Sequence, residues 1–99
     1  MKPITYAPDA RAELLDAIRY YNRQRPGLGE EFRLEFIRVR ELVVANPLRC
    51  APDKLELRKA LLQRFPYKLV HLIRQRDIYV VAAAHNKRAP GYWESRDRD

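Results

Sequence analysis

The chain has 99 residues, the length of a single domain, and this leaves little room for a second one. Hydrophobic residues make up 46% and charged residues 33%, a balance typical of a globular rather than a disordered chain. No apolar run approaches the roughly 18 residues that a membrane-spanning helix needs, and Met1 to Tyr6 lack the apolar stretch of a signal peptide. The sequence therefore predicts a soluble cytoplasmic protein that does not associate with membranes.

The positive charge is concentrated in the second half of the chain. Twenty Lys and Arg residues against thirteen Asp and Glu residues give a formal net charge of +7. Residues 1–50 carry nine basic and seven acidic residues, whereas residues 51–99 carry eleven and six, so the surplus rises from +2 to +5. Such a basic surface suits nucleic acid, a phosphate-rich complex or an acidic protein partner, although a solvated strand edge produces the same pattern.

The chain offers little for thiol or metal chemistry. Cys50 is the only cysteine, so no internal disulfide can form, and the prolines on either side of it predict a loop. Two histidines and one cysteine at scattered positions do not have the spacing of a zinc site. The sequence therefore predicts neither a metal site nor a cofactor.

A short strand and a helix are predicted at the start of the chain. Ile4–Tyr6 is the strand candidate, and the helix begins near Pro8, because Pro fits a first helical turn. Asp9 suits the positive end of the helix dipole. This helix should end near Gln24, since Pro26-Gly27 follows.

A second helix is predicted from about Glu30 to Asn46-Pro47, which ends it. Four apolar residues recur at i, i+4, i+7 and i+11 and form a single face: Phe32, Phe36, Val39 and Val43. Two helices joined by a few residues pack as an antiparallel hairpin, and their apolar faces then need a further layer to cover them.

The second half of the chain is predicted to supply that layer as a sheet. Residues 55–62 alternate weakly, residues 65–73 alternate more clearly, and residues 78–85 are nearly all apolar, as in a strand buried on both faces at the centre of a sheet. The predicted order is β-α-α-β-β-β. We therefore expect one α+β domain over residues 1–99, with an N-terminal helical hairpin packed on an antiparallel sheet and a mobile tail at about 94–99.

His85, at the end of the last predicted strand, is the first candidate for chemistry. A histidine there can be a structural hydrogen-bonding residue, or it can serve as a general acid–base on a phosphodiester. In a nuclease, the cations for the developing phosphorane charge would come from Lys68, Lys87, Arg88 and also Arg64. No carboxylate or tyrosine is plainly placed as a second proton carrier, so no catalytic residue is assigned outright.

Aromatic and basic residues form a second candidate surface. Tyr92 and Trp93 beside basic residues can stack on RNA bases, although a Trp just after the last strand also folds back to cap a core, the interpretation we favour. If the strands are antiparallel, several basic residues share one face, which binds phosphates, an acidic partner or only solvent: Arg58, Lys59, Arg64, Lys68, Arg74 and Arg76. The target-binding candidates are Arg58, Arg64, Lys68, Arg88 and Trp93.

Several segments in a fixed order resemble ParE-like toxins of type II toxin–antitoxin systems, in the RelE/ParE superfamily. These segments are Tyr20-Tyr21, Arg25-Pro26-Gly27-Leu28-Gly29 followed by Phe32, Asn46-Pro47, Arg64-Phe65-Pro66-Tyr67 and His85-x-x-Arg88-x-Pro90-x-x-Trp93. The resemblance covers nearly the whole chain. It implies a helical hairpin on an antiparallel sheet, and a cognate antitoxin that wraps the toxin in a hetero-oligomer.

The resemblance also implies a choice between two targets. ParE-like toxins are associated with inhibition of DNA gyrase, whereas RelE-like toxins cleave mRNA on the ribosome. In the nuclease branch an Arg is expected where this chain has Lys68, a second near Lys87, and a Tyr where it has Trp93. Lys lacks the forked contacts of Arg, and Trp has no hydroxyl to transfer a proton. These departures favour a non-enzymatic gyrase inhibitor over an endoribonuclease.

Two further expectations concern partners. Hydrophobic grooves along the helices and the sheet edge are the predicted antitoxin site, with four apolar positions that the core face does not fully use: Leu14, Leu15, Ile37 and Leu42. The alternative from a different class, supported by charge alone, is a plain nucleic-acid-binding domain, whose binding would depend strongly on salt.

Overall fold

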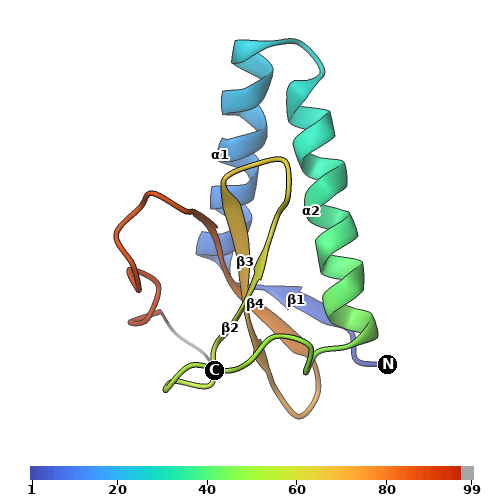
Figure 1. The fold of residues 1–99 in the computed structure, drawn as a ribbon, viewed down its shortest axis with the longest axis vertical. Helices are drawn as coiled ribbons and strands as arrows, with labels where there is room; N and C mark the ends of the chain where they lie inside the picture. Colours follow the sequence, from blue (N-terminus) through green and yellow to red (C-terminus); the bar gives the residue numbers. More distant parts are fainter. Residues whose placement is uncertain (97–99) are drawn as a thin grey trace.

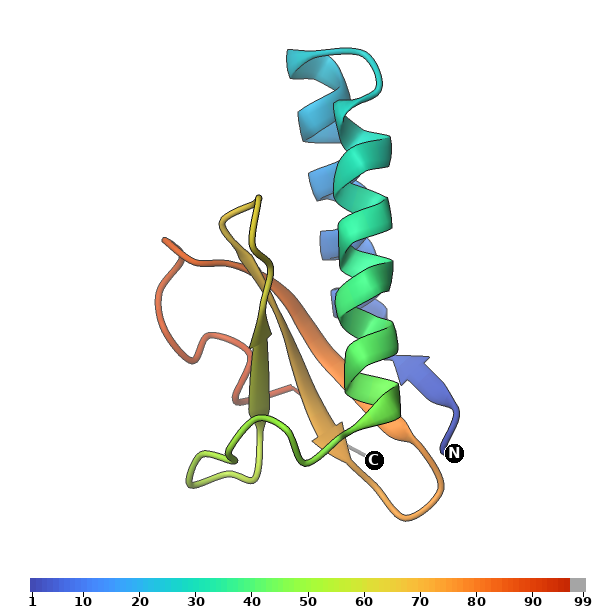
Figure 2. The same cartoon turned by 45° about the vertical axis from the view of Figure 1, so that its right-hand side comes forward.

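The computed structural model describes residues 1–96 and has two layers, a helical hairpin and a four-stranded sheet (Figure 1). The elements follow the predicted order: β1 (Ile4–Tyr6), α1 (Pro8–Gln24), α2 (Leu28–Ala45), β2 (Arg58–Leu61), β3 (Tyr67–Ile73) and β4 (Ile78–His85). Both helices lie against one face of the sheet and extend beyond it (Figure 2). The predicted α+β fold is therefore confirmed.

The turn between the helices explains why α2 begins two residues before the expected Glu30. Gly27 adopts a left-handed conformation, with φ of 90°, which glycine tolerates, and it is the N-cap of α2. The side-chain oxygen of Asn22 accepts a hydrogen bond of 2.8 Å from the Gly29 N–H. A Cβ atom at Gly29 would lie 2.3 Å from the carbonyl oxygen of Ile18, so the close approach of α1 and α2 requires glycine there.

The strand order is β1-β4-β3-β2, which confirms the central position of β4. β3 pairs antiparallel with both β2 and β4, whereas β1 pairs with β4 in parallel, with Ile4 opposite Ile78 and Tyr6 opposite Val80. The sheet is therefore mixed, and the expected antiparallel pairing does not extend to β1. The long connection through both helices carries the chain across the sheet before β4, as a parallel pairing requires.

Two strands begin later than predicted because side-chain carboxylates accept hydrogen bonds from the backbone N–H groups just before them. Before β2, the Asp53 carboxylate accepts the N–H groups of Leu55 and Leu57, and this turn replaces the start of the expected strand. Before β3, the buried carboxylate of Glu35 on α2 accepts the N–H groups of Gln63 and Arg64 at 2.6 and 2.9 Å. These contacts tie the β2–β3 turn to the helix layer.

The core lies on both faces of the sheet. The predicted face of α2 is confirmed, since Phe32, Phe36, Val39 and Val43 are all buried. They pack between the helices and the sheet with Tyr21, Phe65 and Leu69, among others. A second cluster lies on the outer face, opposite the helices: Leu57, Val70, Val81, Ala82, Ala84 and Trp93.

A bulge in β4 determines which of its residues face each cluster. Val70 is opposite Ala82 and His71 is opposite Val80, so Val81 has no partner in the register and forms a bulge. Val81 and Ala82 consequently both pack into the outer cluster, while Val80 and Ala83 pack into the helix-side cluster.

The β3–β4 turn carries a buried ion pair that links it to β1. Arg74 donates two hydrogen bonds of 2.6 Å to the Asp77 carboxylate, and the Thr5 hydroxyl donates a third. The Arg74 bonds, followed by the Thr5 bond, lower the pKa of Asp77 from 3.8 to about 2 against the opposing effect of burial.

This depressed pKa predicts a specific loss of stability in acid. Because the folded pKa lies below the unfolded value, the ionised Asp77 stabilises the fold fully above about pH 4 and loses this contribution as the pH falls through about 2. Urea unfolding should therefore give a difference between wild type and Asp77→Asn that is large at pH 6 and shrinks toward pH 2. A difference that is constant over this range contradicts the prediction, and Asp16→Asn on the exposed face of α1 controls for the lost charge.

Candidate functional site

The segment after β4 crosses the outer face of the sheet, away from the helices (Figure 2). It places the indole of Trp93 against the outer cluster, where the side chain is 1% exposed. Gly91, with φ of 76°, supplies the turn that directs Trp93 inward. Trp93 therefore caps the core, because the apolar outer face of the sheet needs a cover. The prediction that Trp93 binds a target required it to be at the surface, and its burial contradicts that prediction.

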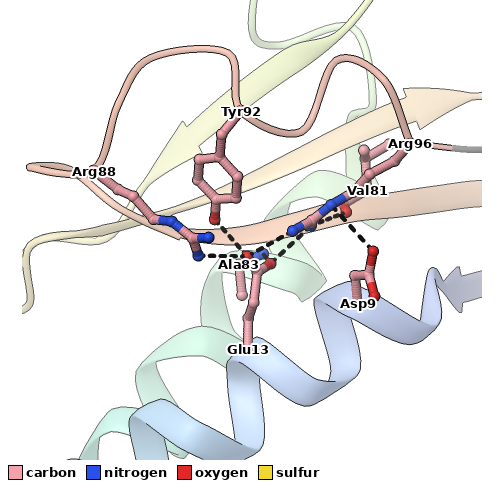
Figure 3. Close-up of polar contacts among 7 residues, drawn as sticks. All are labelled: Asp9, Glu13, Val81, Ala83, Arg88, Tyr92 and Arg96. Atoms are coloured by element: carbon pink, nitrogen blue, oxygen red, sulfur yellow. Dashed lines mark hydrogen bonds and ion pairs between the residues drawn. The ribbon is translucent and has the colours of Figure 1, made fainter.

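Glu13 of α1 is the centre of a polar network that holds this segment (Figure 3). Its carboxylate accepts two hydrogen bonds of 2.9 Å from Arg96, one from the Tyr92 hydroxyl and one of 3.3 Å from Arg88. It also accepts the Ala83 N–H at 3.1 Å, at the β4 edge beyond the end of β1. Its side chain is only 13% exposed, so these bonds form largely out of water.

Arg96 joins this network to the bulge in β4. Its guanidinium also donates a bond of 2.9 Å to the carbonyl oxygen of Val81 and lies 3.5 Å from the exposed Asp9 carboxylate. A mobile tail was expected at about 94–99. Within residues 94–96 the Arg96 side chain is 14% exposed and bonded as described, and residues 97–99 lie outside the described part of the chain.

Tyr92 cannot serve as a general base at neutral pH. Burial, followed by the hydrogen bond to the Glu13 carboxylate, raises its pKa to about 12. The guanidinium of Arg88 lies 3.8 Å from the centre of the Tyr92 ring, a cation–π arrangement. Tyr92 is therefore a hydrogen-bond donor that positions Glu13 and Arg88.

His85 lies beside a cleft of about 310 Å³ between α1, the ends of β3 and β4 and the C-terminal segment. Its Nδ1 atom accepts the Lys87 N–H at 3.0 Å, so the proton of the neutral ring is on Nε2. Its ring meets the Tyr67 ring edge-on, with centroids 5.0 Å apart. Burial, followed by the neighbouring Tyr21 and Tyr20, raises the pKa of Tyr67, which keeps this phenol protonated. Sequence analysis did not identify Tyr67 as the neighbour of His85.

The residues that a nuclease would need together do not surround one point. They are Lys68, His85, Lys87 and Arg88. Lys68 is on the outer face, with its Nζ 5.6 Å from the centre of the Trp93 ring, whereas the His85 ring contacts Tyr67 on the helix side. Arg88 is bonded to Glu13, and Lys87 is exposed. The alternation of side chains along β3 separates Lys68 from the neighbours of His85.

The basic residues of the strand region are also divided, and the single basic face expected from the sequence is not present in residues 1–96. Only Lys59 and Lys68 come together, each with its Nζ 5.6 Å from the centre of the Trp93 ring. Burial, followed by the charge of Lys59, lowers the pKa of Lys68.

The other candidates of this group point elsewhere. Arg58 donates to the carbonyl oxygen of Cys50 in the loop before β2. The exposed Arg64 pairs with Glu31 at 2.8 Å near the tip of the helical hairpin. Arg74 is bonded to Asp77 at the opposite end of the sheet. Strand pairing alone did not reveal these partners, since each is in a different element.

A groove of about 250 Å³ runs between α2 and the edge strand β2. Leu42 lines it and is 39% exposed. Leu61 of β2, which sequence analysis missed, borders it and is 64% exposed, and its pairing with Lys68 places its side chain on the outer face of the sheet. Of the other antitoxin candidates, Leu15 is exposed, and Leu14 and Ile37 are half-buried. The four candidates therefore differ in accessibility, and Leu42 is the one that lines this groove.

Residues 1–96 can also be compared with the requirements of a metal site and of a membrane-spanning helix. No group of three or more His, Cys, Asp or Glu side chains in residues 1–96 is arranged to hold a metal ion. Neither α1 nor α2 is long and apolar enough to cross a bilayer.

No family model matches the sequence, and no curated protein matches it significantly. The fold has a solved counterpart. A chain of the chromosomal ParDE TA (toxin–antitoxin) system from P. aeruginosa superposes with a TM-score of 0.74, over 86% of this chain and 96% of that one, at 17% sequence identity. At this identity the likeness is one of fold, and it agrees with the helical hairpin and sheet expected from the sequence.

Proposed function

We propose that this chain is the toxin of a type II toxin–antitoxin system, a growth inhibitor that a cognate antitoxin neutralises. The observation that carries the proposal is the fold shared with a chain of a ParDE system over nearly all of that chain. The ordered segments that resemble ParE-like toxins, from Tyr20-Tyr21 to Trp93, support it independently.

The groove between α2 and β2 is the proposed antitoxin site. β2 pairs only with β3 within the described sheet, so its outer edge offers free backbone groups to an added strand. Leu42 provides an exposed apolar contact in the groove, and Leu61 adds an exposed apolar side chain beside the free edge of β2. Two cations, Arg38 and Arg49, line the same groove and form no ion pair with a carboxylate in residues 1–96. An acidic amphipathic segment matches this combination.

Co-purification with the small acidic protein encoded beside this gene tests the antitoxin site. Leu42→Glu and Leu61→Glu should each weaken the complex at least about tenfold, because each buries a carboxylate in an apolar contact. Both side chains are exposed in the free protein, so thermal unfolding of the isolated variants should be nearly unchanged. Leu34→Glu, at an exposed position of α2 outside the groove, is the matched control. Wild-type affinity in both groove variants would refute the site and leave the toxin proposal standing.

For the target, we propose DNA gyrase. The nuclease candidates Lys68 and His85 lie on opposite faces of the sheet, which disfavours a shared catalytic site. Purified protein should therefore block supercoiling of relaxed plasmid by gyrase, and antitoxin added first should restore it. Undiminished supercoiling at a saturating concentration of the protein would refute the gyrase proposal.

The second candidate function is a ribosome-dependent endoribonuclease, which the pairing of His85 with Tyr67 beside Arg88 favours. It predicts new mRNA ends on translating ribosomes that disappear in His85→Gln. A plain nucleic-acid-binding domain instead predicts binding to naked DNA or RNA that falls steeply with salt, with no effect on either gyrase or ribosomes.

A further inference from the structure

The cleft beside His85 contains polar groups that the fold and the gyrase proposal leave unused. Its lining includes Asp16, Tyr20 and Arg23 on α1, together with Tyr67 and His85 at the strand ends. The Asp16 carboxylate, the Arg23 guanidinium, the two phenol hydroxyls and the His85 Nε2 have no hydrogen-bond partner within residues 1–96. A cleft with several convergent polar groups and a volume near 300 Å³ is in the range of small-ligand sites.

The walls of the cleft are aromatic. Tyr20, Tyr67 and Tyr92 line it together with the imidazole of His85. The Tyr67 ring is held in place by edge-on contacts with His85 at 5.0 Å and Phe32 at 4.9 Å. Rigid aromatic side chains of this kind provide surfaces on which a planar base can stack.

The cleft is lined by both acidic and basic side chains. The lining carries two acids, Glu13 and Asp16, and two arginines, of which Arg88 is already paired with Glu13. Arg23 adds a second cation along α1, whereas Asp16 leaves one carboxylate free to accept hydrogen bonds. The cleft thus offers cations for an anionic group and a carboxylate for a hydrogen-bond donor.

We propose that this cleft binds a nucleotide whose base carries an exocyclic amino group. The base stacks on the tyrosines and donates its amino hydrogens to Asp16, and the phosphate binds Arg23 and Arg88. A ligand that carries only a cation would pair with Asp16 and leave the Arg23 guanidinium without a partner. The inference does not depend on the antitoxin site or on gyrase, since the cleft is distinct from the α2–β2 groove, and the endoribonuclease alternative would use this same cleft.

Adenosine 5′-monophosphate is the probe, followed through the backbone amide shifts of the full chain. We expect saturable shifts confined to residues around Asp16, Arg23, Tyr67 and His85. Uridine 5′-monophosphate lacks the amino group and inorganic phosphate lacks the base, so both should bind at least about fivefold more weakly. Shifts that are absent, that centre on Lys59 and Lys68, or that phosphate alone reproduces would each overturn the proposal.

Two exposed variants separate the roles of the cleft residues. Arg23→Gln should weaken adenosine monophosphate binding about tenfold but leave adenosine binding unchanged, because a charge-assisted phosphate contact is lost. Asp16→Ala should abolish the preference for the adenine nucleotide over the uridine nucleotide. Arg76→Gln, in the β3–β4 turn at the other end of the sheet, removes the same charge and should have no effect. Equal losses in Arg23→Gln and Arg76→Gln would show general charge attraction and refute the site.

The nucleotide can be free or part of an RNA strand, and a second titration distinguishes these sources. A five-residue oligoadenylate that binds at the cleft more tightly than the mononucleotide identifies the strand as the ligand. Equal or weaker binding identifies the free nucleotide, and both results require the same cleft shifts.

Discussion

Replacing Trp93 with alanine is expected to lower the free energy of unfolding by about 3–5 kcal/mol, the usual cost of removing a large buried aromatic side chain. Trp93 is among the largest fully buried side chains and covers the outer cluster, including Val70, Val81 and Ala82. Its loss would expose this apolar face of the sheet to water. Chemical denaturation of the purified variant measures the change.

Trp93→Phe is the matched comparison for this experiment. The indole Nε1 is buried without a hydrogen-bond partner in residues 1–96, so phenylalanine loses volume but no hydrogen bond. We expect a smaller loss of unfolding free energy, about 1–2 kcal/mol, because the smaller ring leaves part of the packed space unfilled. An alanine variant within 1 kcal/mol of wild type would mean that the C-terminal segment is not packed on the sheet in solution.

Replacing Glu13 with alanine should have the second large effect, a loss of about 3 kcal/mol, because it leaves the half-buried Arg96 without its carboxylate. The loss should be accompanied by release of the C-terminal segment, since Arg88, Tyr92 and Arg96 all bond to this one side chain. Limited trypsin digestion after Lys87 and Arg88 should accelerate strongly in the variant.

Two controls separate the network from a simple loss of charge. Asp9→Ala removes an acid on the same helix whose side chain is 71% exposed, and it should change stability by less than about 0.5 kcal/mol. Glu13→Gln keeps the size of the side chain and should have an intermediate effect. Equal trypsin sensitivity in Glu13→Ala and wild type would show that Trp93 alone holds the segment.

The helices and the central strand were predictable because each depends on local patterns. The spacing of Phe32, Phe36, Val39 and Val43 identifies the buried face of α2 without knowledge of what covers it. The nearly all-apolar run of 78–85 likewise identifies a strand buried on both sides.

What the sequence did not predict depends on contacts between distant residues. A strand of three residues, Ile4–Tyr6, carries no signal for its partner, so its parallel pairing with β4 was not foreseen. The bulge at Val81 was also absent from the pattern, although it determines which alanines face the helices and which face Trp93.

The candidate site was only partly predictable for the same reason. His85, Arg88 and Trp93 were identified, but the residue that organises their segment, Glu13, was missed. A signal for Glu13 was present, since it lies between the buried Ala10 and Ala17 on the core side of α1. An acid at such a position requires a partner, and here the partners come from the far end of the chain.

The pairing of the two ends of the chain has a consequence for synthesis. β1 has no strand partner until β4 has been made, and Glu13 and Arg96 are separated by 83 residues. Because a nascent chain emerges from its N-terminus, the helical hairpin leaves the ribosome long before the sheet has its central strand. The network around Glu13 therefore forms only after Arg96 has left the ribosome. If the chain acts as the proposed toxin, this delay gives its antitoxin time to be present first.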